Sequence, residues 1–280
     1  MLLQLPRQRQ LDLSRPKVMG ILNVTPDSFS DGGRFIGKDA ALAQARAMLA
    51  AGAVILDIGG ESTRPGAEEV PLQQELDRVL PIIEAIRSEL DCVISIDSCK
   101  TQVMKEAVAA GADIINDIKA LLEPGAVEVV AAAGVPVCLM HMQGQPRTMQ
   151  HSPLYQDVVK EVADFLLQRA EVCIAAGIPQ GQILLDPGFG FGKSLQHNYQ
   201  LLSQLSDLVA LNYPVLAGMS RKSMIGQLLN VPAAERLAGS LACATIAVMK
   251  GARIIRAHDV KETVQAVAVA SATLFGVEHG

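Results

Sequence analysis

Short apolar runs that each end in a polar residue recur eight times along the 280-residue chain. The first run, Val18–Leu22, ends at Asn23, and stretches rich in Ala, Leu, Gln and Glu separate it from the next runs. The other seven are Val54–Leu56 before Asp57, Val93–Ile96 before Asp97, Ile114–Ile115 before Asn116, Val135–Met140 before His141, Ile183–Leu185 before Asp186, Val215–Gly218 before Ser220, and Ile254–Ile255 before Arg256.

This alternation predicts eight βα units on a parallel sheet, with helices such as Asp39–Ala51 and Leu72–Leu90 between the strands. No Ser/Gly-rich linker or charge block divides the chain, and α/β barrels of this length are commonly one domain. We therefore expect a single-domain (β/α)8 TIM barrel over residues 1–280, with a short N-terminal extension at 1–16. The carboxyl ends of all barrel strands gather at one face, so the scattered polar residues form one pocket. That arrangement is typical of an enzyme.

Composition argues against several classes of protein. The net charge is -5 and aromatic residues make up only 3% of the chain, without Trp, so we expect no nucleic-acid partner. The five cysteines form no C-x-x-C pair, which favours core thiols of a reduced, cytoplasmic protein. The N-terminus has no continuous apolar segment, and the uncharged stretch Thr263–Val277 is too short to span a bilayer. We therefore expect a soluble protein with no membrane partner.

Loop length marks the places where a ligand is expected. The loop that runs to Gly37 and the loop Gly59–Pro71 are long for a compact fold, and such loops are commonly lids or ligand loops. Two further irregular stretches, Met142–Pro153 and Pro187–His197, follow later strands. In the last stretch, we expect glycines to let the backbone approach a ligand and aromatic rings to wall it: Gly188, Phe189, Gly190, Phe191 and Gly192.

Seven blocks resemble, in order, the dihydropteroate synthase family of bacterial type. The first two are Gly20–Gly33, which reads GILNVTPDSFSDGG, and Gly59–Gly66, which reads GGESTRPG. The other five are Asn116–Ile118, Met140–Met142, Asp186–Gly192, Gly218–Ser223 and Arg256–Val260. The resemblance extends from about the first strand to the last helix and implies a (β/α)8 barrel. The chain departs from the pattern at Ser98-Cys99, where relatives commonly carry Thr and rarely Cys, and at Lys119, where Arg is frequent.

The resemblance implies a transferase that joins 4-aminobenzoate to 6-hydroxymethyl-7,8-dihydropterin diphosphate and releases diphosphate. A carboxylate accepts two parallel hydrogen bonds from the donor edge of a pterin, so Asp186 is expected there, with Asp97 and Asn116 beside it. Lys222 would donate to the acceptor atoms, and Arg256 would stack on the ring. A single Asp or Asn after a strand is commonly only a helix N-cap. Three of them at barrel strand ends beside a lysine favour ligand roles.

The diphosphate needs a local cluster of donors on a protein that is acidic overall. Asn23, Arg64, Arg256 and His258 follow strands that adjoin in a closed barrel, and we expect them to bind it. A core imidazole is the alternative for His258. The resemblance implies magnesium as the cofactor, bridging the diphosphate and Asn23 with help from Asp27.

The arylamine carboxylate needs a separate anion site. Ser220 and the backbone N–H groups of a helix expected to begin near Arg221 provide one. The expected walls of this pocket are Thr63, Pro65, Phe29 and Phe191. Sulfonamides resemble 4-aminobenzoate, so we expect them to inhibit at the same place.

We expect a dissociative displacement, in which diphosphate leaves before the arylamine attacks the pterin methylene. The residues expected to act in catalysis are Asp97, Asp31, Lys222, Arg256 and His258. The alternatives are a methyl-tetrahydrofolate-binding corrinoid methyltransferase domain and a non-catalytic pterin-binding paralogue. Neither has a reason to keep both the Thr25–Gly33 loop and the Ser220–Lys222 block.

The last two helical segments predict a homodimer. Glu235–Met249 and Glu262–Gly276 are apolar or small over most of the helix circumference, whereas a barrel helix normally keeps one polar face. Because the apolar residues extend beyond the stripe that packs on the barrel, we expect a second copy of the chain to cover the remaining apolar surface.

Overall fold

Eight parallel strands form a closed barrel in the computed structural model, which describes residues 1–25, 34–62, 69–144, 149 and 153–277. Their order is β8-β7-β6-β5-β4-β3-β10-β9, and a parallel bridge between Leu185 and Val215 closes the ring. The strands are β3 Lys17–Asn23, β4 Ile55–Gly59, β5 Val93–Asp97, β6 Ile114–Asp117, β7 Val137–Met140, β8 Ile183–Asp186, β9 Leu216–Ala217 and β10 Ile254–Ala257. Each apolar run of the sequence is one of these strands, so the predicted (β/α)8 fold is confirmed.

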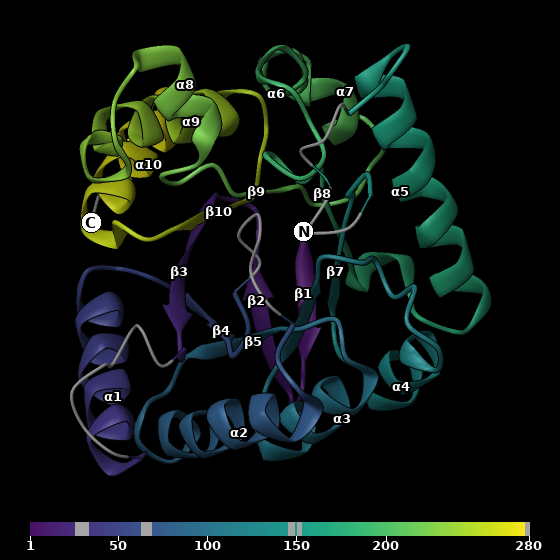
Figure 1. Cartoon of the computed structure of the whole chain (residues 1–280), viewed down its shortest axis with the longest axis vertical. Helices are drawn as coiled ribbons and strands as arrows, with labels where there is room; N and C mark the ends of the chain where they lie inside the picture. Colours follow the sequence, from purple (N-terminus) through teal and green to yellow (C-terminus); the bar gives the residue numbers. More distant parts are fainter. Residues whose placement is uncertain (26–33, 63–68, 145–148, 150–152, 278–280) are drawn as a thin grey trace.

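Helices surround the barrel on its outer side (Figure 1). They are α1 Arg34–Ala50, α2 Leu72–Glu89, α3 Thr101–Ala110, α4 Ala126–Ala133, α5 Val158–Ala175, α6 Leu195–Ser203, α7 Leu205–Val209, α8 Ser223–Leu229, α9 Leu237–Met249 and α10 Val260–Phe275, with short 3-10 turns at Gln180–Gln182 and Ala233–Glu235. Helix α1 begins before the expected Asp39 and runs through Gly37, because a single glycine costs a helix only about 1 kcal/mol. Among the described residues, no helix is long and apolar enough to cross a membrane.

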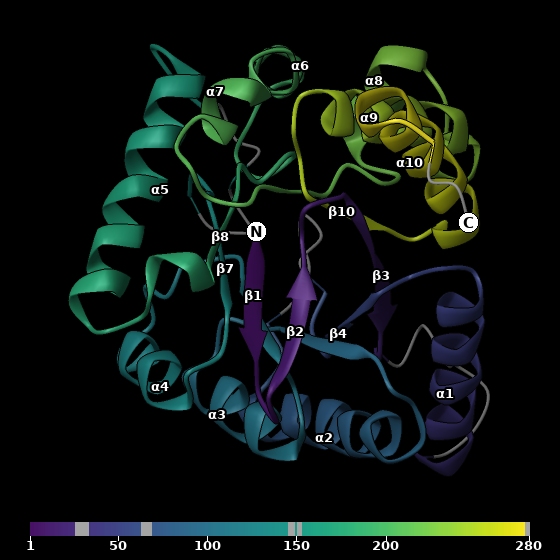
Figure 2. The same cartoon turned by 180° about the vertical axis from the view of Figure 1, so that it is seen from behind.

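The first 13 residues form a hairpin that plugs the amino-terminal end of the barrel, as Figure 2 shows. Strands β1 Leu2–Leu5 and β2 Arg9–Asp12 pair antiparallel. Their alternate side chains, Leu3 to Leu13, pack on a layer to which each barrel strand contributes one residue. That layer consists of Met19, Ile55, Val93, Ile114, Cys138, Leu184, Leu216 and Ile254. The expected N-terminal extension is therefore part of the barrel core.

A buried carboxylate fastens the hairpin to the barrel. Asp113 is fully buried, and the Nη2 atoms of Arg7, Arg9 and Arg87 each lie 2.5 Å from one of its oxygens. The backbone N–H of Ile94 donates a fourth hydrogen bond at 2.9 Å. The amino-terminal end of the barrel is thus closed by leucines and held by one ion cluster.

Inside the barrel, the layer of side chains that follows the apolar layer toward the carboxyl ends of the strands contains polar residues. Alternate residues of a strand face the same side, so the residue two positions after each member of the apolar layer also points inward. In five strands that second residue is polar: Ile55 is followed by Asp57, Val93 by Ser95, Ile114 by Asn116, Leu184 by Asp186, and Ile254 by Arg256. The barrel therefore has an apolar amino-terminal half and a polar carboxyl-terminal half.

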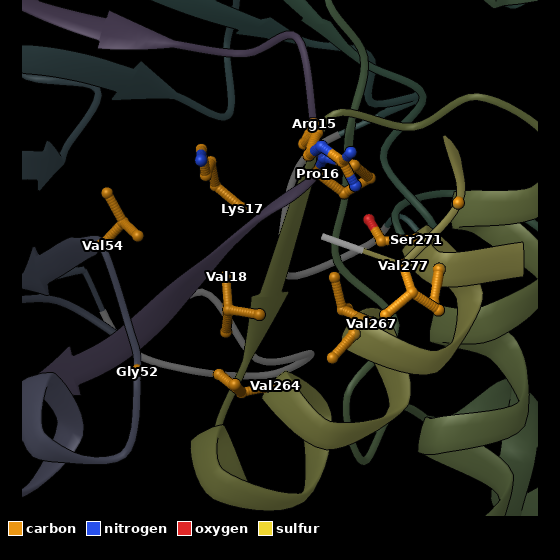
Figure 3. Close-up of a pocket in the computed structure, with 13 residues that line it drawn as sticks. Arg15, Pro16, Lys17, Val18, Gly52, Val54, Val264, Val267, Ser271 and Val277 are labelled. Atoms are coloured by element: carbon orange, nitrogen blue, oxygen red, sulfur yellow. The ribbon is translucent and has the colours of Figure 1, made fainter. Parts of the chain in front are cut away.

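A pocket of about 370 Å³ lies on the outer wall of the barrel between β3 and α10 (Figure 3). Val18 and Val54 line it from the barrel, and Val264 and Val267 line it from α10. Lys17, the first residue of β3, also lines it. None of the site residues expected from the sequence lines this pocket, so it is separate from the polar end of the barrel.

Candidate active site

Arg256 occupies the centre of the polar half, held between two carboxylates. Its Nε donates to Asp57 Oδ2 at 2.6 Å, and its Nη2 donates to Asp97 Oδ2 at 2.6 Å. Asn116 Nδ2 donates to the same oxygen of Asp57 at 3.2 Å. Asp57 is fully buried and connects three strands, although it is not among the residues predicted to bind a substrate. The guanidinium plane of Arg256 is thereby fixed before any ligand arrives.

A single guanidinium, that of Arg256, faces two carboxylates, those of Asp57 and Asp97. The three side chains therefore offer less positive than negative charge. Burial raises the pKa of Asp97 from its usual 3.8 to about 7, against the lowering effect of Arg256, and the nearby Asp57 raises it further. Burial alone would lower the pKa of Arg256, but Asp57 and Asp97 raise it above its usual value. Asp97 therefore titrates near neutral pH, while Arg256 stays charged.

Lys222 and Asp186 form the second charged pair of the site. Lys222 Nζ donates to the backbone oxygen of Phe189 at 2.5 Å and lies 4.5 Å from the centroid of the Phe191 ring. Burial lowers the pKa of Lys222 to about 8, and Asp186 opposes that shift. Burial likewise raises the pKa of Asp186, against Lys222 and a 2.7 Å hydrogen bond from Gly188 N. The two residues therefore lie close enough to influence each other's pKa.

An apolar cluster lies at the same end of the barrel. Phe191 is its only aromatic member and is 8% exposed. The other members, of which the sequence analysis had assigned none to the site, are Ile118, Met140, Met149, Cys99 and Met142. Methionine side chains adapt their shape to a flat ring. Burial raises the pKa of the Cys99 thiol to about 12, so this departure from the family pattern adds a neutral, weakly polar group.

Asn23 lies at the carboxyl end of β3, between β4 and β10, as the closed barrel predicted. It pairs with Gly59 across the sheet, and Gly59 pairs with Asp97. A Cβ at Gly59 would lie 3.7 Å from both Asn23 Oδ1 and Asp97 Oδ2. Asn23, Asp97 and Arg256 therefore lie at the ends of β3, β5 and β10, with β4 between the first two strands.

Ser220 and His258 lie together, although the sequence analysis assigned them to different halves of the site. Ser220 Oγ accepts a hydrogen bond from His258 N at 3.1 Å and lies 3.0 Å from His258 Nδ1. The helix expected near Arg221 begins instead at Ser223, with Lys222 at its N-cap. The reason is that Arg221 has a left-handed backbone with φ 57°, which interrupts the helix. Ser220 is thus a strand-end residue and not a helix terminus.

The glycines after β8 pack against protein backbone, contrary to the expectation that they approach a ligand. A Cβ at Gly188 would lie 2.0 Å from His141 O, and one at Gly192 would lie 2.2 Å from Gln143 O. Of the three glycines, only Gly190 has a predicted site residue beside the position of its missing Cβ, with Lys222 Cδ 3.3 Å from such a Cβ. Phe189 is fully buried in the main core, so of the two rings only Phe191 adjoins the site.

Six residues expected in the site lie outside the described residues. They belong to the first two long loops and are Asp27, Phe29, Asp31, Thr63, Arg64 and Pro65.

Comparison with known proteins agrees with this geometry. Residues 19–258 match the family model described as Pterin binding enzyme. The chain is 58% identical over 269 residues to the dihydropteroate synthase of Escherichia coli strain K12, covering 96% of this chain and 95% of that one.

Solved structures give the same result. A Yersinia pestis dihydropteroate synthase in a sulfonamide drug complex matches with a TM-score of 0.93 and 59% identity, over 98% of this chain and 99% of that one. A Xanthomonas albilineans dihydropteroate synthase with 4-aminobenzoic acid matches with a TM-score of 0.92 and 49% identity, over 98% of each chain. The chain therefore belongs to the pterin-binding enzymes and, among them, to the dihydropteroate synthases.

Proposed function

We propose that this barrel condenses 6-hydroxymethyl-7,8-dihydropterin diphosphate with 4-aminobenzoate to give dihydropteroate and diphosphate. The observation that carries the proposal is the Arg256 network with Asp57, Asp97 and Asn116, next to the charged pair of Asp186 and Lys222. It offers carboxylate and amide acceptors, an ammonium donor and a fixed guanidinium within one end of the barrel. The apolar cluster around Phe191 adds a surface for a flat ring.

The pterin ring would bind by its edges. Asp186 accepts from the ring N–H and the exocyclic amine, because an ionised carboxylate matches two parallel donors. Asp97 and Asn116 complete that edge, and Lys222 donates to the carbonyl oxygen and ring nitrogen on the other side. Arg256 lies against the ring face, with its plane held by the two carboxylates.

The diphosphate would bind where β3, β4 and β10 end. Asn23, Arg256 and His258 come from that region, and Arg64 follows β4 outside the described residues. Magnesium prefers oxygen ligands and commonly takes few from the protein. The described residues contain no group of three or more His, Cys, Asp or Glu side chains that could hold a metal, which fits an ion bound mainly by diphosphate.

The donor set near the diphosphate fits this hard cation. Asn23 offers an amide oxygen beside the Asp97 carboxylate, and Asp27 would add a second carboxylate. Bound there, magnesium would neutralise charge on the leaving diphosphate.

The arylamine would bind on the far side of the pterin methylene. Ser220, whose Oγ lies 3.0 Å from His258 Nδ1, would donate to the carboxylate, and Phe191 would wall the ring. Thr63, Pro65 and Phe29 complete this half in the proposal. The complexes of relatives with 4-aminobenzoic acid and with a sulfonamide drug support a shared site for substrate and inhibitor.

Catalysis would be electrostatic and positional. Departure of diphosphate leaves positive charge on the pterin methylene, which Asp97 and Asp31 would stabilise, while Arg256, His258 and Lys222 hold the diphosphate and the pterin. The arylamine nitrogen then forms the new C–N bond and loses a proton. No strong base is needed, because an arylamine is uncharged at neutral pH.

The test is a diphosphate-release assay with both substrates and magnesium, omitting each in turn. We expect release to require all three. Lys222→Ala and Asp186→Asn should each weaken pterin binding by about 2–4 kcal/mol, the typical cost of removing a charged hydrogen bond in a buried site. Calorimetry that gives wild-type pterin affinity in both variants would contradict the assignment of the two edges.

A homodimer through α9 and α10 is also part of the proposal. Both helices expose large apolar side chains, among them Ile246 at 42%, Met249 at 44% and Val269 at 69%. Isolated exposed apolar residues are ordinary, but several on two neighbouring helices that pack on each other indicate a covered face. A second copy of the chain is the partner that the symmetry of common oligomers favours.

A further inference from the structure

A buried lysine that the sequence analysis had left unassigned joins the two loops after β7 and β8. Lys193 is only 2% exposed. Its Nζ lies 2.9 Å from His141 Nδ1 and 3.3 Å from His141 O, and it donates to Gly188 O and Phe191 O, each at 3.0 Å. The three backbone oxygens are acceptors, and the imidazole nitrogen accepts in one of its two tautomers. Lys193 is therefore an internal cation within a cage of acceptors.

The cage exists because two loops meet backbone to backbone. Gly188 and Gly192 adopt φ of 68° and 62°, and the absence of a Cβ lets them approach His141 O and Gln143 O. This approach brings three carbonyl oxygens to one point, where their partial negative charges repel. An ammonium with three hydrogens satisfies such a point, and nothing else among the described side chains there is a cation.

The loop that Lys193 holds contacts Asp186 and Lys222, the two residues proposed for the two pterin edges. Gly188 N donates to Asp186 Oδ1, Phe189 O accepts from Lys222 Nζ, and the Phe191 ring lies below the same ammonium. Within the segment Gly188–Phe191, the backbone oxygens of Gly188 and Phe191 accept hydrogen bonds from Lys193 Nζ. A shift of the loop would therefore move the Asp186 carboxylate, the Lys222 ammonium and the Phe191 ring relative to each other.

Electrostatics connect Lys193 to the same pair. Burial lowers the pKa of Lys193, and the nearby Asp186 opposes that shift. In turn, Lys193 adds to Lys222 and Arg256 in opposing the rise that burial imposes on the pKa of Asp186. Lys193 thus favours the ionised carboxylate without lying in the site.

We propose that Lys193 is a positioning residue for pterin recognition, which fixes the Gly188–Phe191 loop and through it the geometry of Asp186 and Lys222. The proposal rests on the function proposed above, because the ligand is the pterin diphosphate. It predicts that loss of Lys193 weakens pterin binding in molecules that are fully folded, and affects the arylamine half less, because Phe191 is the one arylamine wall that belongs to this loop.

The experiment compares Lys193→Met, which keeps the length of the side chain but no donor, with Lys193→Gln, which keeps amide donors. The matched control is Arg87→Met, which removes a partner of buried Asp113 at the opposite end of the barrel. Calorimetry with the pterin diphosphate gives both Kd and the fraction of molecules that bind. Steady-state kinetics at saturating pterin diphosphate give the KM for 4-aminobenzoate.

We expect Kd for the pterin diphosphate to rise at least about tenfold in Lys193→Met and by less in Lys193→Gln, a factor of ten being about 1.4 kcal/mol. The KM for 4-aminobenzoate should rise by a smaller factor than the Kd for the pterin diphosphate, and Arg87→Met should bind pterin diphosphate with wild-type Kd. If Lys193→Met does not fold, a raised Kd in Lys193→Gln supports the proposal in the same way. Variants that bind with wild-type Kd but at a reduced bound fraction would show a purely structural role and overturn it. Failure of the wild-type protein to bind the pterin diphosphate would instead refute the proposed function.

Discussion

Replacing Asp97 by Asn should remove a pH dependence of stability that the wild-type protein shows. The folded protein binds the Asp97 proton more tightly than the unfolded chain, because burial raises its pKa from 3.8 to about 7. The folded state therefore holds more protons than the unfolded state between those pH values. Stability then falls as the pH rises through this window, and the loss is complete above the folded pKa.

The magnitude follows from the width of the window that an experiment can use. At pH 5 the unfolded aspartate is already mostly ionised, whereas folded Asp97 keeps its proton up to about pH 7. Two pH units at about 1.36 kcal/mol each give a loss of about 2–3 kcal/mol between pH 5 and pH 8. Asn at this position has no proton to lose, and Arg256 keeps Asp57 as its partner.

Urea denaturation of both proteins at pH 5, 6, 7 and 8 measures this difference. Over this pH range, we expect the free energy of unfolding of the wild type to fall by about 2–3 kcal/mol more than that of Asp97→Asn. Contributions of Asp117 and Lys222 are present in both proteins and cancel to first order. Parallel curves for the two proteins would refute the reasoning, because they would mean that Asp97 is ionised throughout. The variant should also lose diphosphate release, so stability and activity would change in opposite directions at pH 8.

Three further predictions concern other parts of the molecule. Asp113→Ala should lower the free energy of unfolding by about 2–4 kcal/mol, because it leaves three partly exposed arginines without their shared carboxylate. Both KM values should stay at wild type, and a change in either would contradict the separation of the two barrel ends. Light scattering at micromolar concentration should give twice the chain mass of 29.7 kDa, and a mass near that of one chain would exclude the proposed dimer. Sulfonamide inhibition should be competitive with 4-aminobenzoate, and inhibition independent of the 4-aminobenzoate concentration would contradict a shared site. Phe29→Leu or Pro65→Ser should weaken inhibition more than substrate use, because the drug projects beyond the natural substrate.

The barrel strands could be predicted because the apolar layer and the polar layer succeed each other along each strand. Val93–Ile96 followed by Asp97, for example, places an apolar residue inside the barrel and a carboxylate at its end. The hairpin also had a signal, which is the alternation of Leu3, Leu5, Leu11 and Leu13 around a turn at residues 6–8. Such a pattern indicates a strand pair with one buried face.

Asp57 and Lys193 could not be assigned from local pattern, because their partners lie far away in the sequence. Asp57 stands inside a strand, and its partner Arg256 is 199 residues distant. Counting in steps of two from Ile55 would have placed it in the polar layer. Lys193 looks like an ordinary loop lysine, and only the meeting of two loops buries it. Glycine spacing likewise indicated a close approach after β8, but not that the partner is the backbone of the loop after β7.

The hydrogen bonds of the free site decide how it recognises its ligand. Arg256 is bonded to Asp57 and Asp97, and Lys222 to Phe189 O, so none of these groups is held in the barrel without compensation. A pterin diphosphate that binds must exchange some of these bonds for its own, and the net gain depends on geometry more than on charge. The carboxylates outnumber the cations in this part of the site, which favours a ligand edge made of donors. In the proposed mechanism the same excess would favour the positive charge that develops on the pterin methylene, because it would place fixed negative groups near the reacting carbon before the reaction begins.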